Sequence, residues 1–172
     1  TPRTAGFNTI DNGILTNGSV LMTIVLMFIG ASPGSTGGGI KTTTLAILSF
    51  AIISMLKGKK DISVFKRRIP NDNFREASGL VFLAATFIFV IVMILLIIEP
   101  FRFEDIIFEA ISAFGTVGLS RGITPFLSSQ GKILITLLMY IGRVGPLTLI
   151  YAFAKKKNYS NINYAEESIA IG

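Results

Sequence analysis

Thr4–Gly30 reads TAGFNTIDNGILTNGSVLMTIVLMFIG, and Thr116–Gly142 reads TVGLSRGITPFLSSQGKILITLLMYIG; the two stretches align without a gap at a constant offset of 112 residues. Each begins with a loop centred on a glycine, Gly6 or Gly118, and continues into an apolar segment. A soluble domain gains little from repeating this arrangement. A pore built from repeats around an axis requires it, because each repeat supplies one wall of the filter.

The composition predicts an integral membrane protein. Hydrophobic residues make up 51% of the chain, the mean hydropathy is +0.65, and the apolar residues lie in long runs. Ala77–Ile98 carries no charge, and at about 1.5 Å per residue it covers the roughly 30 Å hydrocarbon core. Its internal position excludes a signal peptide. The chain has no Cys and no His, so thiolate, imidazole and zinc chemistry lack their usual ligands, and we expect neither an enzyme nor a bound cofactor.

Basic residues next to the apolar runs predict the orientation. Seven of the 16 Lys and Arg lie in the connector at residues 57–76, and three more form Lys155-Lys156-Lys157. Both segments are therefore expected on the cytoplasmic side, in contact with anionic lipid headgroups. The basic residues lie beside spanning segments and lack interleaved aromatic residues, so we expect no nucleic-acid binding.

The first apolar region must be broken. One continuous helix from Ile14 to Leu56 would be about 65 Å long, twice the hydrocarbon thickness. Two full crossings would place the basic connector on the same side as the first loop, in conflict with the return through Ala77–Ile98. We therefore expect one crossing made of two half-helices, Ile14–Gly30 and Ile40–Leu56. Irregular backbone between them is tolerated at membrane depth only where it is buried or lines a water-filled path.

The interruption reads GSTGGGIKTTT over Gly34–Thr44. Its glycines permit positive φ and close approach, and its hydroxyls can bond freed backbone groups. A loop outside the membrane is the simpler alternative. A phosphate-binding loop of the form G-x-x-x-x-G-K-[ST] fails on register, because Ile40 stands where Lys is required and no apolar strand precedes the loop.

A short apolar piece, Ile106–Phe114, follows the long span and is too short to cross a membrane. Glu104 and Asp105 begin it, where carboxylates favour a helix N-terminus, and Gly115 ends it. The pattern predicts a re-entrant pore helix whose negative C-terminal end points towards a cavity and stabilises a cation there. The chain is then expected to return outside at 121–131 and to cross inwards over Lys132–Ala154.

The two glycine loops have the residue types of an ion filter. Gly6 and Gly118 allow dihedrals that turn successive carbonyl oxygens towards an axis, where they replace the water shell of a cation. A single T-x-G tripeptide is common and usually marks a turn; the specificity lies in two copies at one offset, one of them preceded by a pore helix. We expect a K+ or other monovalent cation to be bound by backbone carbonyls of these filter residues: Thr4, Ala5, Gly6, Phe7, Asn8, Thr116, Val117, Gly118, Leu119 and Ser120.

The motifs T-A-G-F-N-T, G-S-T-G-G-G-I-K-T-T, F-G-T-V-G-L-S and G-R-V-G-P-L-T, in this order, resemble the Trk, Ktr and HKT superfamily of potassium ion-translocating subunits, most closely the Ktr membrane subunit. The resemblance runs from Thr1 to Gly172. It implies an all-α integral membrane fold in which repeats of helix, re-entrant pore helix, filter loop and helix surround a central pore. It also implies potassium uptake by a homodimer in the bacterial plasma membrane, with a cytosolic nucleotide-binding regulatory subunit, and leaves Na+ open as a co-ion or activator.

By this resemblance the chain holds the filter and broken second helix of repeat three at 1–56, the cytoplasmic basic connector at 57–76, repeat four at 77–154 and a cytoplasmic tail at 155–172. The other repeats would come from the rest of a longer protein or from another chain. In the family the first repeat's filter can decide between Na+ and K+, so ion choice stays open.

The resemblance also assigns control of the pore. It implies an intramembrane gate beneath the filter, formed by Gly34, Ser35, Thr36, Gly37, Gly38, Gly39 and Lys41. Arg143 corresponds to a basic residue that faces the pore below the filter. Its position independently suggests the same, because an unpaired charge inside a span costs several kcal/mol and normally faces a cavity. A snorkelling or salt-bridged side chain is the alternative.

A non-channel secondary transporter is the competing class, since its sites also lie at broken helices near the midplane. It predicts an ionisable coupling residue inside the spans. Glu99, Glu104 and Asp105 lie at the edges of spans and Glu109 lies within the pore helix, so the sequence favours a channel-like pore. A purely structural subunit would leave the two glycine loops without a purpose.

Overall fold

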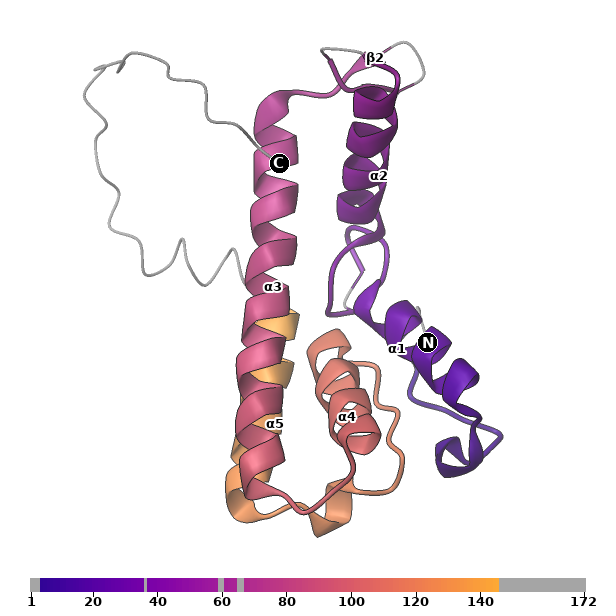
Figure 1. The fold of residues 1–172 in the computed structure, drawn as a ribbon, viewed down its shortest axis with the longest axis vertical. Helices are drawn as coiled ribbons and strands as arrows, with labels where there is room; N and C mark the ends of the chain where they lie inside the picture. Colours follow the sequence, from indigo (N-terminus) through magenta and orange to yellow (C-terminus); the bar gives the residue numbers. More distant parts are fainter. Residues whose placement is uncertain (1–3, 36, 59–60, 65–66, 146–172) are drawn as a thin grey trace, which may run out of the picture.

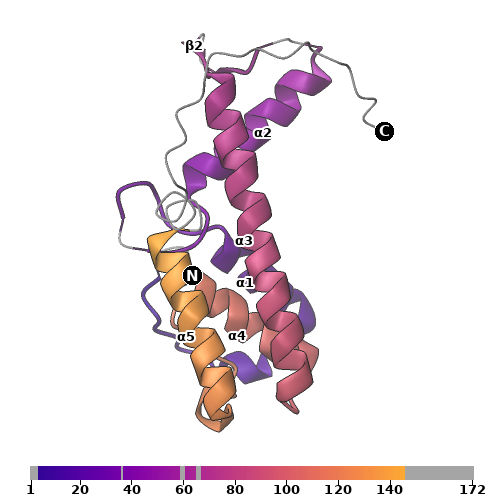
Figure 2. The same cartoon turned by 90° about the vertical axis from the view of Figure 1, so that its left-hand side faces the viewer.

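The computed structural model describes residues 4–35, 37–58, 61–64 and 67–145 (Figure 1). Along the chain it has these elements: a 3-10 turn η1 (Asn12–Ile14), α1 (Asn17–Phe28), α2 (Thr42–Leu56), β1 (Ser63–Val64), β2 (Arg67–Arg68), α3 (Asn71–Ile98), α4 (Phe103–Gly115), a 3-10 turn η2 (Thr124–Phe126) and α5 (Ser129–Val144). Helix α3 runs the length of the molecule. At one end it lies beside α2, and at the other it packs with α4 and α5 (Figures 1 and 2).

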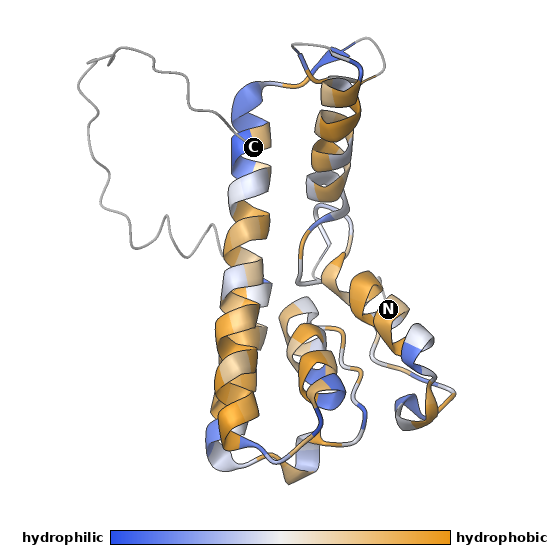
Figure 3. Ribbon diagram, in the orientation of Figure 1, coloured by the Kyte–Doolittle hydropathy of each residue, from blue (hydrophilic) through white to orange (hydrophobic). Residues whose placement is uncertain are grey.

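Helix α3 contains the expected span Ala77–Ile98. Among the described residues it is the one helix long and apolar enough to cross a membrane, with a mean hydropathy of 3.3 over its most apolar 18 residues. Only 28% of that window is buried, and large apolar side chains such as Phe82 and Ile97 are 72% and 82% exposed. Figure 3 shows hydrophobic residues along most of α3, with hydrophilic residues at the end that joins the connector. Such a surface fits lipid or further protein, not water.

The first apolar region forms two separate helices, α1 and α2, with irregular backbone between them. The two ends of this irregular segment are joined by a parallel bridge between Ile29 and Ile40. The amide of Gly30 donates to the Ile40 carbonyl at 2.7 Å, and the Ile40 amide donates to the Phe28 carbonyl at 3.3 Å. The bridge closes residues 30–40 into a loop, because these hydrogen bonds replace the helical partners that the chain has lost there.

The basic connector departs from the expected all-α fold. Strands β1 and β2 pair antiparallel, with Ser63 opposite Arg68 and Val64 opposite Arg67. An exposed ion pair between Arg68 and Asp61, at 2.9 Å, lies beside them. The molecule is therefore mostly helical with a two-residue ladder at its polar end.

Helix α4 is the buried element of the fold. It begins three residues before the expected Ile106, with Glu104 and Asp105 in its first turn, and ends at Gly115. At 13 residues it is about 20 Å long, shorter than the hydrocarbon core. It packs against α1, α3 and α5 (Figure 2). Of the largest fully buried side chains, Ile106, Phe108 and Phe114 lie on it, and the others are Met27, Leu95, Leu138 and Val117.

Helix α5 forms the first part of the expected crossing over Lys132–Ala154, and residues 146–154 lie outside the described residues. It begins at Ser129 and ends at Val144, where Gly145 has a φ of 89°. Pro146 follows in the sequence and cannot continue a helix. Arg143 therefore lies in the last turn of α5 and not in the middle of a continuous helix. A basic side chain there is favourable, because the C-terminal end of a helix carries partial negative charge. The expected tail at 155–172 lies outside the described residues.

Elements of the two aligned stretches begin 112 positions apart. The turns η1 and η2 do so, as do the helices α1 and α5. Their N-caps are also equivalent: the Thr16 hydroxyl accepts from the Ser19 amide, and the Ser128 hydroxyl accepts from the Gly131 amide. The inner ends differ, since α1 ends at Phe28 while α5 continues past the equivalent position.

Candidate functional site

The first T-x-G loop (Thr4–Asn8) and the second T-x-G loop (Thr116–Ser120) have the same backbone pattern. Thr4 and Thr116 both have a φ of 51°, and Gly6 and Gly118 have φ values of 74° and 81°. The two threonines are the non-glycine residues with positive φ in the part of the chain that the structure describes. Sequence reasoning did not find this, because a β-branched residue disfavours the left-handed region. Left-handed residues at alternate positions turn successive carbonyl groups to the same side of the strand, which an ordinary strand does not do.

The two loops lie in direct backbone contact. A Cβ added to Gly6 would lie 3.3 Å from the Val117 carbonyl oxygen, and one added to Gly118 would lie 3.2 Å from the Gly6 Cα. A side chain at either glycine would require both a strained φ and a shift of the opposite loop. The structure therefore brings together two predicted filter loops that are more than a hundred residues apart in the sequence. Phe7, by contrast, is 94% exposed.

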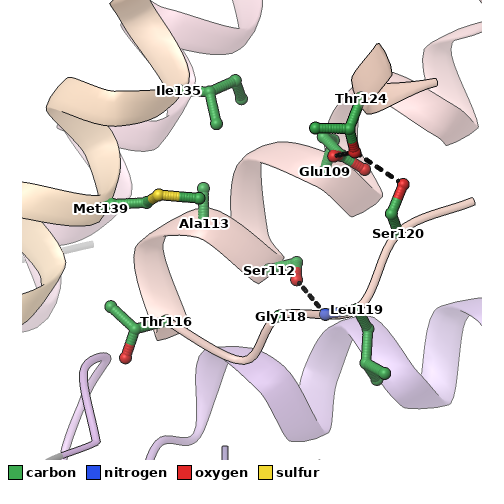
Figure 4. Close-up of a pocket in the computed structure, with 10 residues that line it drawn as sticks. All are labelled: Glu109, Ser112, Ala113, Thr116, Gly118, Leu119, Ser120, Thr124, Ile135 and Met139. Carbon is green, nitrogen blue, oxygen red and sulfur yellow. Dashed lines mark hydrogen bonds between the residues drawn. The ribbon is translucent and has the colours of Figure 1, made fainter. Parts of the chain in front are cut away.

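Helix α4 holds the outgoing half of the second T-x-G loop. Its Ser112 hydroxyl accepts from the Leu119 amide at 3.0 Å. The hydroxyls of Ser120 and Thr124 lie 2.8 Å apart, and Thr124 also donates to the carboxylate of Glu109 (Figure 4). A cavity of about 290 Å³ lies between this loop, α4 and α5. Of these side chains the sequence had identified Ser120 as a filter residue and had noted Glu109 within the pore helix.

The charged start of α4 also contacts the segment that leaves the second T-x-G loop. Arg121 pairs with Asp105, with 3.0 Å between Nε and Oδ1, and the Arg121 side chain is only 9% exposed. Asn12, which is 112 positions before Thr124, reaches across from the first stretch: its side-chain amide donates to the Ser120 carbonyl at 3.1 Å. Neither contact could be read from the sequence, because each joins residues from different segments.

The glycine-rich loop (Gly34–Lys41) lies against both threonines. The Gly38 amide donates to the Thr116 hydroxyl at 2.9 Å. A Cβ added to Gly37 would lie 3.2 Å from the Thr4 hydroxyl oxygen. Thr36 lies outside the described residues, and Gly34 and Ser35 are exposed.

Lys41 closes the glycine-rich loop on itself. Its ammonium group donates to the Gly37 carbonyl and lies 3.5 Å from the Ser35 carbonyl. Carbonyl oxygens that face a cation in this way resemble the oxygen ligands of a metal ion, with the lysine ammonium in the place of the ion. The loop is thereby held folded beneath the two T-x-G loops.

Two equivalent glycines, Gly30 and Gly142, make the closest approaches. A Cβ on Gly142 would overlap the Phe114 carbonyl oxygen, and one on Gly30 would overlap the Gly38 carbonyl oxygen. The Gly142 carbonyl in turn lies 3.0 Å from the position of a Cβ at Gly38. Arg143, next along the chain, is exposed on the surface of the described residues. The structure thus places the Gly142 backbone, next to Arg143, beside the glycine-rich loop.

Comparison with known proteins shows to which family the chain belongs. The sequence profile of the TrkH family, described as a cation transport protein, matches residues 1–163. The Ktr system potassium uptake protein B of Bacillus subtilis is 42% identical over 172 residues, which is 100% of this chain and 38% of that protein. The potassium/sodium uptake protein NtpJ of Enterococcus hirae is 43% identical over 178 residues, 100% of this chain and 40% of that protein.

A solved structure agrees at the level of the fold. The crystal structure of the potassium transporter TrkH from Vibrio parahaemolyticus superimposes with a TM-score of 0.73 at 19% identity, covering 89% of this chain and 35% of that one. The chain thus spans well under half the length of the relatives that it matches. The match to the family profile covers nearly the whole chain, and on that ground this chain belongs to the TrkH family of cation transport proteins.

Proposed function

We propose that this chain forms part of a potassium-translocating pore in a Trk/Ktr-type uptake system, with the two T-x-G loops as two walls of its filter. One observation carries the proposal: two loops with the same alternation of left-handed residues meet at Gly6 and Gly118. Carbonyl oxygens turned to one side can replace the hydration shell of K+. The relatives compared above are a potassium uptake protein and a potassium/sodium uptake protein, which supports K+ as the transported ion.

Helix α4 contributes to the same site electrostatically. It ends at Gly115, directly before the second T-x-G loop. A helix C-terminus carries about half a negative elementary charge on its free carbonyl groups, which favours a cation at the inner end of the loop. We therefore assign α4 the role of a re-entrant pore helix. Its length of about 20 Å and the burial of its residues from Phe108 to Gly115 support that assignment.

The glycine-rich loop acts as the gate in this proposal. It contacts Thr4 and Thr116 at the inner end of both T-x-G loops, so an ion leaving the filter inwards meets it first. Lys41 holds it folded through the Gly37 and Ser35 carbonyls. Arg143 lies nearby on the last turn of α5 and adds a positive charge that raises the barrier to a cation.

The wider assembly follows the same reasoning. The basic connector lies at the polar end of α3, opposite the turn η2, and we place it in the cytoplasm of a bacterial cell. Exposed apolar side chains on α1, α3 and α5 would meet lipid and the remaining repeats. A homodimer and a cytosolic nucleotide-binding subunit are the partners that the family resemblance suggests.

Substitution of Gly118 tests the filter. In the full-length protein reconstituted in liposomes, we expect Gly118→Ser to lower the ratio of K+ to Na+ flux by about tenfold. The reason is that serine disfavours a φ of 81° and its Cβ would press on Gly6. Gly79→Ser is the matched control, since a Cβ at Gly79 meets nothing within 4 Å. Unchanged flux ratios, together with unchanged K+-dependent growth of a transport-deficient host, would contradict the assignment.

A secondary transporter is a second candidate, favoured by one observation: Glu109 is an ionisable side chain buried inside the molecule, at 6% exposure. In that case Glu109→Gln should abolish concentrative uptake and leave downhill K+ exchange and its selectivity intact. In a channel-like pore, downhill flux and its selectivity are the properties that change.

A further inference from the structure

Three side chains on one face of α4 contact the outgoing end of the second T-x-G loop. Asp105, Glu109 and Ser112 are spaced at i, i+4 and i+7, so they lie along one side of the helix. Asp105 pairs with Arg121, Glu109 reaches Ser120 through Thr124, and Ser112 accepts from the Leu119 amide. Three successive residues of the chain are thus each held by one polar side chain of α4.

Glu109 occupies the middle of this face and is the most deeply placed carboxylate of α4. It is 6% exposed, and Thr124 donates its hydroxyl proton to the Glu109 carboxylate. A carboxylate only accepts, and a hydroxyl has one proton to give. The single Thr124 proton is therefore shared between the Glu109 carboxylate and the Ser120 hydroxyl, which lies 2.8 Å from the Thr124 oxygen.

These hydrogen bonds form one connected group. The Gly122 amide donates to the Ser120 hydroxyl at 2.9 Å, and the Thr124 hydroxyl donates both to Ser120 and to Glu109. Figure 4 shows the three side chains close together beside the cavity. Removing the carboxylate would take away one of the two acceptors that orient Thr124, so Thr124 and the Ser120 hydroxyl beside it would no longer be held in one arrangement.

Ser120 is also where the two aligned stretches meet on the outer side. Its hydroxyl is held by α4, while its backbone carbonyl accepts from the buried side chain of Asn12 at 3.1 Å. Asn12 and Thr124 occupy equivalent positions in the two stretches. Thr124 therefore contacts the side chain of Ser120, and Asn12, its equivalent in the first stretch, bonds the carbonyl of Ser120.

We infer that Glu109 is a positioning residue which, through Thr124 and Ser120, holds the outer end of the filter and thereby sets its selectivity among monovalent cations. The inference rests on the proposed function. Discrimination between K+ and Na+ depends on the spacing of the carbonyl oxygens and on the electric field of the carbonyl dipoles, and both change when the filter backbone moves. Such a site tolerates displacements of only about 0.5 Å, so its supporting side chains matter as much as the filter backbone.

The test measures the ratio of K+ to Na+ flux in the full-length protein reconstituted in liposomes. Thr124→Val removes the hydroxyl at constant shape and Thr124→Ser keeps it. We expect Thr124→Val and Glu109→Ala to lower the flux ratio about tenfold, the effect of losing a hydrogen bond to a charged group. Thr124→Ser should retain the wild-type ratio. Glu104→Gln is the charge control. Glu104 lies on the same helix, its side chain is 36% exposed, and it does not bond to Ser120.

The outcomes separate the inference from the function on which it rests. If Thr124→Val and Glu109→Ala keep the wild-type ratio while Gly118→Ser lowers it, the positioning role is wrong and the filter assignment stands. Equal losses of K+ and Na+ flux at a constant ratio would also overturn the inference, because they indicate only a general loss of folded protein. Ser120→Ala is the second variant to use if Glu109→Ala does not fold. If Gly118→Ser leaves the ratio unchanged as well, the proposed function itself fails.

Discussion

At the scale of single residues, glycines are required here by close approach between backbones. Gly142 packs on the Phe114 carbonyl and Gly30 packs on the Gly38 carbonyl, so neither position has room for a methyl group. The two positions are equivalent in the aligned stretches, and each brings the end of one helix against a buried carbonyl. The packing of α5 against α4 therefore depends on a residue outside the proposed filter.

Gly142→Ala should destabilise the full-length protein. Either α5 or the end of α4 must move, and overpacking of this kind costs about 1–3 kcal/mol. The measurement is the thermal unfolding midpoint of the purified protein in detergent, which we expect to fall. Gly79→Ala serves as the control: its Cβ enters open space on helix α3, where alanine is favoured over glycine by roughly 1 kcal/mol. Equal midpoints for the two variants would argue against the close packing.

At the scale of elements, the glycine-rich loop combines flexibility with a defined closed form. The two ends of the loop are joined by the bridge between Ile29 and Ile40. Within the loop, Lys41 bonds the Gly37 carbonyl and the Thr116 hydroxyl accepts from the Gly38 amide. These contacts are few and polar, and the outer part of the loop, Gly34 and Ser35, is exposed. A segment held by a small number of polar contacts opens at lower free energy than the helices around it.

Lys41→Met should raise K+ flux through the full-length protein. The substitution keeps the length of the side chain and removes the ammonium that holds the Gly37 and Ser35 carbonyls, so the loop is expected to open more often. Deletion of Gly37–Gly39 should act in the same direction and more strongly. Lys57→Met, at an exposed position that ends α2, is the control. Unaltered or lower flux in both loop variants would exclude a gate in this loop.

At the scale of the whole molecule, charge and hydropathy are divided along α3. Its 28 residues give a length of about 42 Å, with the polar connector at one end and the turn η2 near the other. This division predicts opposite sides of the membrane for the two ends. The absence of Cys from all 172 residues makes the prediction directly testable with single cysteines.

In a full-length protein freed of cysteines elsewhere, Gln130→Cys should react with an impermeant maleimide added to intact cells. Asn71→Cys should react only after the cells are permeabilised, because the positive-inside rule places the connector in the cytoplasm. Both positions are exposed in the structure, so access within the protein is matched. Labelling of Asn71→Cys in intact cells would indicate the opposite orientation. The glycine-rich loop would then not lie on the inward side of the filter.

Much of the fold could be predicted because the relevant signals are local. The uncharged run at Ala77–Ile98 lies within α3, the acidic pair Glu104 and Asp105 lies in the first turn of α4, and the first apolar region divides at its glycines. Two local features lie outside those signals. The connector contains a short β ladder, and α5 ends at Val144, where Gly145 follows with a positive φ.

By itself the sequence determined which segments are apolar enough for a membrane, where they break, and which two loops share a T-x-G pattern. Only the tertiary structure decided that Gly6 meets Gly118, that the glycine-rich loop bonds Thr116, and that Glu109 reaches Ser120. The physical reason is the range of the interactions. Hydropathy and helix ends depend on neighbours along the chain, whereas these contacts join segments up to 112 residues apart, and packing alone selects which of them meet.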